Sequence, residues 1–120
     1  MKYKVFTAYN ETYYFNFHIM FGKEKDAVAE YIRRNPKNKL RLAVTGDKSG
    51  GMWSEDAAQE VYIYIKNKRD VPTICHEAYH SVINCLGYRS NITSSDAGGE
   101  EATAYLLGWL VKKIMEARNA

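Results

Sequence analysis

Two histidines and one glutamate in the middle of the chain have the spacing of a metal site. In the stretch His76-Glu77-Ala78-Tyr79-His80 the histidines are four residues apart, and Glu77 directly follows the first of them. Residues four apart on a helix project from one face, one turn apart, so both imidazoles can bind one metal ion. Glu77 could then act as general base toward a water bound to that metal. This pattern, HExxH, predicts zinc-assisted hydrolysis.

The flanking residues predict that this stretch lies on a helix over residues 71–86. Pro72 stands near its start, Asp70 precedes it and Gly87 follows its end. Apolar side chains occupy two of its faces: Ile74, Ala78, Val82 and Leu86 on one, and Cys75, Tyr79 and Ile83 on the other. We therefore expect a buried, central helix whose polar groups need partners, which a metal would provide. The alternative is a pair of core histidines bonded to backbone groups or tyrosine hydroxyls.

A catalytic zinc usually has three protein ligands, so two histidines do not complete the site. Ile83 and Leu86 stand where the longer HExxHxxGxxH pattern requires Gly and His, which excludes that class. The third histidine of the chain, His18, lies far away in the sequence on an expected strand. The third ligand is therefore expected among the acids that follow the motif.

A helix expected from about residue 98 to residue 117 would fold back on the first one and carry acids in its first turn. Glu101 is the first candidate for the third ligand and Glu100 the second. Small residues beside Glu101 would let the two helices approach closely, since it shares a face with Ala104, Tyr105 and Gly108. Both acids could instead complement the N-terminus of the helix. Asp96 is a weaker candidate for the third ligand and is expected instead to act as a helix cap.

The motif and the following helix together resemble the gluzincin metallopeptidases. The likeness is strongest to their smallest members, the ImmA/IrrE-type peptidases and the small HExxH proteins encoded by phages and prophages. It covers residues 60–112, about half of the chain, and implies a small zincin-like domain. It also implies zinc ligands at His76, His80 and Glu101, with Glu77 as the base. An edge strand within residues 40–66 would hold an extended peptide substrate beside the cleft.

Three functions follow from these patterns. The first is a zinc-dependent metallopeptidase, in which Tyr105 or Tyr88 could donate a hydrogen bond to the oxyanion. The second is a catalytically silent zincin-fold module that binds a protein partner. The third is a small nucleic-acid binder. It would depend only on the basic cluster within residues 33–41, which lacks interleaved aromatic residues, so we expect a solvated helix end there instead.

Composition indicates one domain of 120 residues with a net charge of +3, which does not by itself favour a nucleic-acid partner. The N-terminal residues show no signal-peptide pattern, and no apolar run is long enough to span a membrane. Cys75 and Cys85 lie ten residues apart on the expected helix, too far apart to form a disulfide. They are expected to be reduced, buried thiols in a cytoplasmic protein.

The remaining elements are expected to form a small α+β domain. Residues 2–9 and 12–21 should form a hairpin, with odd residues of the second strand facing the core and His18 on its solvated face. A helix over residues 23–34 follows. Further strands are expected at residues 40–44 and 61–65, separated by a mobile glycine-containing loop over residues 45–54. Our expected architecture is a mostly antiparallel four-stranded sheet with both motif helices on one face.

Overall fold

A computed structural model describes residues 4–36, 48–90 and 97–120. The elements in chain order are β1 (Val5–Asn10), β2 (Phe15–Phe21), α1 (Glu24–Arg34), β3 (Gly50–Glu55), the 3-10 turn η1 (Asp56–Ala58), β4 (Glu60–Ile65), α2 (Val71–Ser90) and α3 (Ala97–Arg118). The expected hairpin, all three expected helices and the strand near residues 61–65 are confirmed. Residues 40–44, the expected third strand, lie outside the described ranges.

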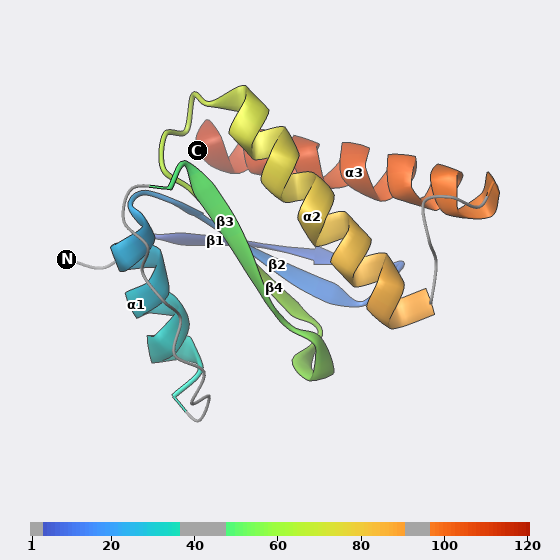
Figure 1. The fold of residues 1–120 in the computed structure, drawn as a ribbon, viewed down its shortest axis with the longest axis horizontal. Helices are drawn as coiled ribbons and strands as arrows, with labels where there is room; N and C mark the ends of the chain where they lie inside the picture. The colour runs from blue at the N-terminus through green and yellow to red at the C-terminus, as the bar shows by residue number, and fades with distance from the viewer. Residues whose placement is uncertain (1–3, 37–47, 91–96) are drawn as a thin grey trace.

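The four strands form one mixed sheet in the order β1-β2-β4-β3. The outer pairs, β1–β2 and β3–β4, are antiparallel, whereas the central pair β2–β4 is parallel. After β2 the chain passes through α1 and then through β3, which runs opposite to β2. It turns back into β4, which therefore runs in the same direction as β2 (Figure 1). The fold class α+β is therefore confirmed, with a mixed sheet.

Helices cover both faces of this sheet (Figure 1). α2 and α3 pack against each other and on one face, as expected from the sequence. The core under them takes alternate residues of β2 and β4 and one stripe of each helix: Phe15, Phe17, Ile19, Val61, Ile63, Ile65, Ile74, Ala78, Val82, Cys85, Leu86, Leu106, Leu110 and Ile114. The core thus contains every second residue of the strands and the residues on one face of each helix, as the two-residue and 3.6-residue periods predict.

The opposite face of the sheet is buried under α1. Met20, Tyr62 and Tyr64 form a second core there with Ala27 and Tyr31 of α1. His18 lies on this face and is 6% exposed, so the expectation of a solvated strand histidine is wrong. The alternation of β2 identified the face under α2 and α3, but it could not show that α1 covers the other face.

Residues 50–54, expected in a mobile loop, instead form most of the edge strand β3. Glycine is depleted in strands, which explains why the sequence favoured a loop here. The two glycines are required by close packing on both sides of the strand. A β-carbon on Gly51 would lie 2.6 Å from Tyr64 Cε1, and one on Gly50 would meet α2.

α2 differs from the expected helix in length and in burial. It passes Gly87 and ends at Ser90. Only the face with Ile74, Ala78 and Val82 is buried, so the expectation of a helix buried on nearly every side is wrong. Cys85 is a buried thiol as expected, but Cys75 is exposed. Within the described ranges, no helix is both long and apolar enough to cross a membrane.

Candidate metal centre

The N-terminus of α2 is fixed by Asp70, which acts as its cap. The Thr73 amide donates to Asp70 Oδ1 at 3.2 Å, and the Thr73 hydroxyl donates to Asp70 Oδ2 at 2.6 Å. These hydrogen bonds hold the pKa of Asp70 below its usual value. The cap satisfies helix donors that would otherwise lack a partner and sets where the first turn begins. His76 and His80 therefore project from the second and third turns.

The two histidines of the motif converge on one point. Their Nε2 atoms lie 3.1 Å apart, with the rings nearly perpendicular at 80° and their centroids separated by 4.6 Å. Two nitrogen ligands of a tetrahedral zinc ion, each bonded at about 2.0–2.1 Å, are separated by roughly 3.3 Å. The observed separation is close to this value. The pair therefore fits a zinc ion as two adjacent ligands.

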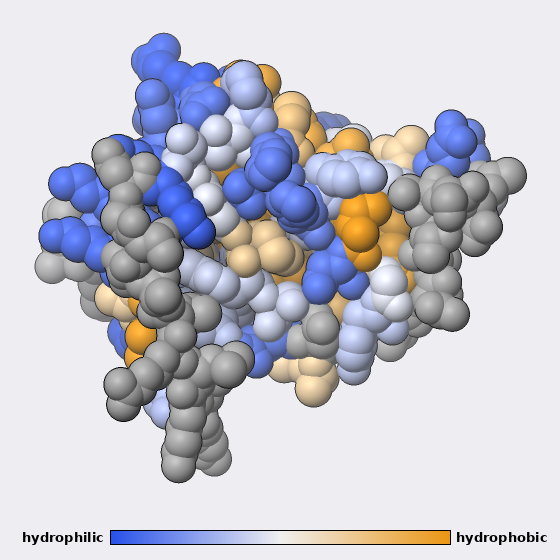
Figure 2. Space-filling model, viewed as in Figure 1, coloured by the Kyte–Doolittle hydropathy of each residue, from blue (hydrophilic) through white to orange (hydrophobic). Residues whose placement is uncertain are grey.

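Both imidazoles lie on the exposed face of α2, and the side chain of His76 is 65% exposed. This exposure contradicts the alternative of core histidines. Tyr79 and Ile83, which were expected to be buried, are 43% and 36% exposed on the same side of the helix. Figure 2 shows hydrophilic and hydrophobic residues side by side on the surface over α2. The histidine pair thus opens to solvent beside an apolar surface.

Glu77, in contrast, is buried at the edge of the sheet. Its side chain is 10% exposed, and its Oε2 lies 4.0 Å from His76 Nε2. Burial raises the pKa of Glu77, an effect that His76, His80 and Lys48 partly oppose. A carboxyl group with a raised pKa next to two potential metal ligands has the position and the proton affinity of a general base.

The edge strand β3 begins directly beside this carboxyl group. A β-carbon on Gly50 would lie 3.2 Å from Glu77 Cγ and 2.7 Å from Thr73 Cγ2. Only a residue without a side chain allows the strand to approach α2 this closely. The sequence pattern did not identify Gly50 as a residue of the site. The available signal for a close approach of the backbone was the pair of adjacent glycines, Gly50 and Gly51, between two apolar segments. This pair was interpreted as part of a loop.

The proposed third ligand lies on another helix. Glu101 and Glu100 are exposed near the start of α3. Across the ranges that the structure describes, no three His, Cys, Asp or Glu side chains form a group that could hold a metal. α2 continues for ten residues after His80, which at about 1.5 Å per residue places its end roughly 15 Å further on. This extension separates the start of α3 from the histidine pair.

The helix face expected to approach α2 is also exposed. Ala104, Tyr105 and Gly108 are exposed, and a β-carbon on Gly108 would meet no atom within 4 Å. The expected close approach through small residues is therefore wrong. α3 instead buries Thr103, Leu106 and Leu110. The ligand role of Glu101 stays a prediction, and Asp96 lies outside the described residues.

The two tyrosines considered as oxyanion donors are both on the surface. Tyr105 is 53% exposed and Tyr88 is 49% exposed. The ring of Tyr88 packs edge-on against Phe15, with centroids 6.1 Å apart, at the end of α2 that lies away from the histidines. Neither side chain is brought to the histidine pair by an observed contact, so their catalytic role stays a prediction.

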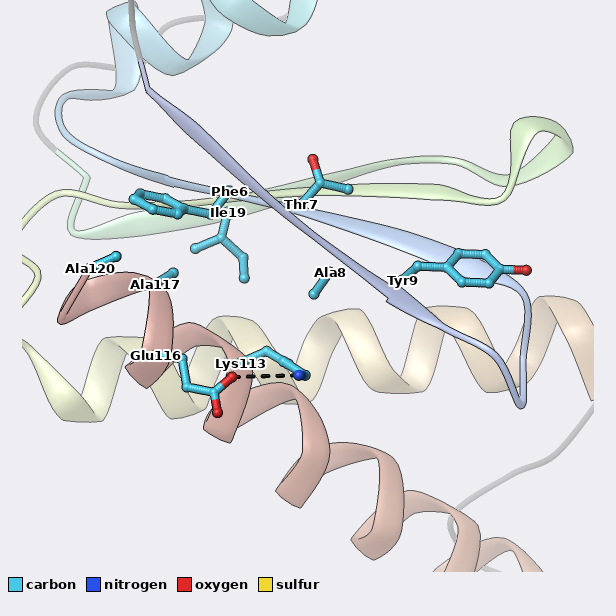
Figure 3. Close-up of a pocket in the computed structure, with 9 residues that line it drawn as sticks. All are labelled: Phe6, Thr7, Ala8, Tyr9, Ile19, Lys113, Glu116, Ala117 and Ala120. Carbon is cyan, nitrogen blue, oxygen red and sulfur yellow. Dashed lines mark ion pairs between the residues drawn. The ribbon is translucent and has the colours of Figure 1, made fainter.

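A cavity of about 390 Å³ lies in another part of the molecule, between β1 and the end of α3. Figure 3 shows Phe6 and Ile19 pointing from the sheet toward α3, where Lys113 and Glu116 form an ion pair across 3.5 Å. This lining contains one ion pair and no histidine or cysteine. Glu116 is the one zinc-binding type of side chain in this lining, which is too few ligands for a zinc site.

A partly buried polar cluster lies on the α1 side of the sheet, separate from the motif. His18 Nε2 is 3.2 Å from Glu60 Oε1, and the Thr7 hydroxyl is 2.8 Å from His18 Nδ1. Tyr62 also donates to Glu60 Oε1 at 2.8 Å, and its ring stacks on His18. Desolvation raises the pKa of Tyr62 to about 12. The cluster satisfies buried polar groups of three strands and lies on the face of the sheet opposite α2.

Comparisons of this chain with protein-family models, with curated proteins and with solved structures find no match.

Proposed function

We propose that this protein is a zinc-dependent metallopeptidase of gluzincin type, with a small zincin-like fold. The observation that carries the proposal is the convergence of His76 and His80 to an Nε2–Nε2 distance of 3.1 Å, with the buried Glu77 carboxyl 4.0 Å from His76 Nε2. Two imidazoles and an adjacent carboxyl on one helix suit the chemistry of zinc hydrolases. The edge strand β3 beside Glu77 offers main-chain groups along which a peptide could lie.

In this proposal His76 and His80 hold the zinc ion, with Glu101 as the predicted third ligand. Glu101 would complete the set only if the first turn of α3 came closer to His80 than it lies in this structure. A bound zinc ion supplies Lewis acidity, which polarises the scissile carbonyl and acidifies the attacking water. Glu77 accepts the proton of that water through its carboxylate. It then passes the proton to the leaving amine nitrogen as the carbon–nitrogen bond breaks.

One observation favours a second function, a zincin-fold module that binds a protein partner without catalysis. Within the described ranges no third ligand accompanies the histidine pair, and the pair lies on an exposed helix face beside Tyr79 and Ile83. Such a surface could serve a partner as well as a substrate. Peptide hydrolysis distinguishes the two functions.

The test is cleavage of a diverse peptide mixture by the zinc-supplied protein, followed by mass spectrometry. We expect the wild type to cleave peptide bonds and Glu77→Gln to cleave none while still binding zinc. Glu116→Gln is the matched control, because it makes the same change at an exposed glutamate on α3 and should retain activity. A Glu77→Gln protein that still cleaves would remove Glu77 as the base. A wild type that binds zinc but cleaves nothing would favour the binding module.

A further inference from the structure

The exposed face of α2 carries no formal charge over most of the helix. From Val71 to Tyr88, Glu77 is the one Asp, Glu, Lys or Arg residue, and it is buried. At about 1.5 Å per residue this part of the helix is roughly 27 Å long. Its exposed residues are apolar, aromatic, or polar without a formal charge: Val71, Pro72, Cys75, His76, Tyr79, His80, Ile83, Gly87 and Tyr88. We call them the neutral face.

The neutral face is open to solvent in this structure. Figure 1 shows α2 crossing the front of the molecule, and no helix or strand of the described ranges lies over it. Charged groups occur at its borders. Asp70 precedes the first turn, where it caps the helix, and Lys48 acts on Glu77 from the side of β3. The middle of the face, around the two histidines, is therefore neutral and accessible.

The composition of the neutral face is typical of a protein interface. A helix on the surface of a globular protein normally presents charged and polar residues opposite its apolar stripe. Protein interfaces, in contrast, are depleted in Lys, Glu and Asp at their core and enriched in Tyr. A face without formal charge can also pack against a copy of itself without repulsion between like charges. The composition therefore favours an interface and permits a symmetric one.

The middle of the neutral face provides half of the ligands of a zinc ion. Zinc usually has four ligands in a tetrahedral arrangement. His76 and His80 provide two adjacent ones, with their Nε2 atoms 3.1 Å apart. Among the residues that the structure describes, no third His, Cys, Asp or Glu completes a metal-binding group with them. A second copy of the chain offers the same two imidazoles, and a twofold axis through the metal would bring both pairs together.

We propose that two copies of this chain share one zinc ion when zinc is scarcer than protein, with His76 and His80 of each copy as its four ligands. Tyr79 and Ile83, on the same side of the helix as the histidines, are then covered by the second copy. All four positions of the metal are taken by histidine, so none is left for water or substrate. The dimer is therefore a closed form of the proposed peptidase. This inference rests on the zinc ligands of the proposed function and not on its catalysis.

The size of the contact explains why the dimer needs the metal. Two crossing helices touch over a few turns only, which buries less than the roughly 1,200–2,000 Å² of stable protein interfaces. We therefore expect the metal-free chain to be a monomer. With one zinc ion per chain, each histidine pair holds its own ion, and two such ions at the centre of one interface repel each other. The fully loaded chain should therefore be a monomer as well.

The test counts the chains and the zinc ions in each particle. Metal-free protein is titrated with zinc and followed by native mass spectrometry and sedimentation velocity. We expect monomers without zinc, dimers with a single zinc ion at one ion per two chains, and zinc-bound monomers at one ion per chain. His80→Gln should form no dimer, because each copy then offers one imidazole. Cys75→Ser changes an exposed potential ligand beside His76 and should dimerise like the wild type.

A charge placed on the neutral face tests the interface separately from the metal ligands. Ile83→Glu should weaken the zinc-dependent dimer by at least about tenfold, because dimerisation would bury an unpaired carboxylate of each chain. Zinc binding by the monomer should persist, since both histidines are unchanged. Ile32→Glu is the matched control. It makes the same change at an exposed isoleucine on α1 and should dimerise like the wild type.

Three results would overturn the proposal: a wild type that stays monomeric at every zinc ratio, a dimer that contains one zinc ion per chain, or a dimer that Ile83→Glu does not weaken. These results are distinguishable from a failure of the peptidase function. A monomer that binds zinc and cleaves peptides at every ratio removes the shared site and leaves the peptidase. A dimer with one shared zinc ion, together with a zinc-loaded monomer that cleaves nothing, leaves the shared site and removes the peptidase.

Discussion

Gly50 lies directly against Glu77: a β-carbon at position 50 would come within 3.2 Å of Glu77 Cγ, and within 2.7 Å of Thr73 Cγ2. This contact joins the edge strand to the helix that carries the two histidines. It places the main chain of β3 beside the carboxyl group proposed as the base. The contact matters for the proposed chemistry because it places β3, along which a peptide would lie, next to the carboxyl group of Glu77, which would transfer the proton.

Gly50→Ala should destabilise the protein by about 1–3 kcal/mol, the usual effect of adding a methyl group where there is no room. Gly87→Ala is the matched control. It adds the same methyl group on exposed α2, where nothing lies within 4 Å, and should stabilise the helix by roughly 0.5–1 kcal/mol. Urea denaturation of both variants measures the free energy of unfolding. Equal stability of Gly50→Ala and the wild type would show that β3 does not pack this closely on α2.

His76→Ala and His80→Ala should each abolish stabilisation by zinc. A ligand that binds only the folded state raises the free energy of unfolding by RT ln(1 + [L]/Kd). Zinc should therefore raise the melting temperature of the wild type but not of either variant. Cys75→Ser changes an exposed potential ligand next to His76 and should keep the full zinc effect. A loss of the zinc effect in Cys75→Ser would make that thiol a ligand, contrary to our assignment.

Glu101→Gln should weaken zinc binding, whereas Glu100→Gln should not. Both residues lie exposed near the start of α3, so the pair tests ligand identity with little effect on the fold. Loss of a direct ligand should cost more than the roughly 10–100-fold in affinity that is typical of outer-shell partners. Isothermal titration with zinc provides the affinities. Unchanged affinity in both variants would exclude the first turn of α3 as the source of the third ligand.

His18 should make the fold less stable in mild acid. Burial lowers the pKa of His18 below 6.5, and Arg34 adds to this effect while Glu60 opposes it. Below pH 6.5 the unfolded chain therefore binds more protons than the folded one, so the free energy of unfolding decreases as the pH falls from 6.5 toward the folded-state pKa. Above pH 6.5 the contribution is constant.

The measurement for this prediction is urea denaturation of the wild type and of His18→Gln at several pH values from 5 to 8. The neutral amide cannot gain the proton, so the variant should lose less stability than the wild type on acidification. Thr7, Tyr62 and Glu60 face the same position in both proteins, and their contributions largely cancel in the comparison. The same slope in both proteins would show that His18 does not contribute to the pH dependence.

The sequence predicted well those elements whose pattern is strong and local. The alternation of Phe15, Phe17 and Ile19 identified a strand and its core face, and the spacing of Ile74, Ala78 and Val82 identified the buried stripe of α2. The position of the two histidines on one helix face followed from the same periodicity. These features depend only on the spacing of residues within one strand or one helix, which can be read from a single sequence.

The errors concern features that tertiary packing decides. Gly50 and Gly51 suggested a loop, but α2 and the ring of Tyr64 leave no space for a side chain at these two positions of the strand. His18 was expected in solvent because nothing in β2 itself indicates that α1 covers it. Tyr79 and Ile83 suggested a second buried face, yet α3 packs elsewhere and leaves them exposed. The apolar character of a side chain does not show which other element, if any, packs against it.

The zinc content of the purified protein, measured by elemental mass spectrometry, tests the central claim most directly. We predict one zinc ion per chain in the wild type and in Glu77→Gln, and none in the double variant His76→Gln/His80→Gln. The same stoichiometry in the double variant would place the metal elsewhere. A wild type without zinc, even after zinc is supplied, would contradict the assignment of His76 and His80 as metal ligands, and the proposed peptidase with it.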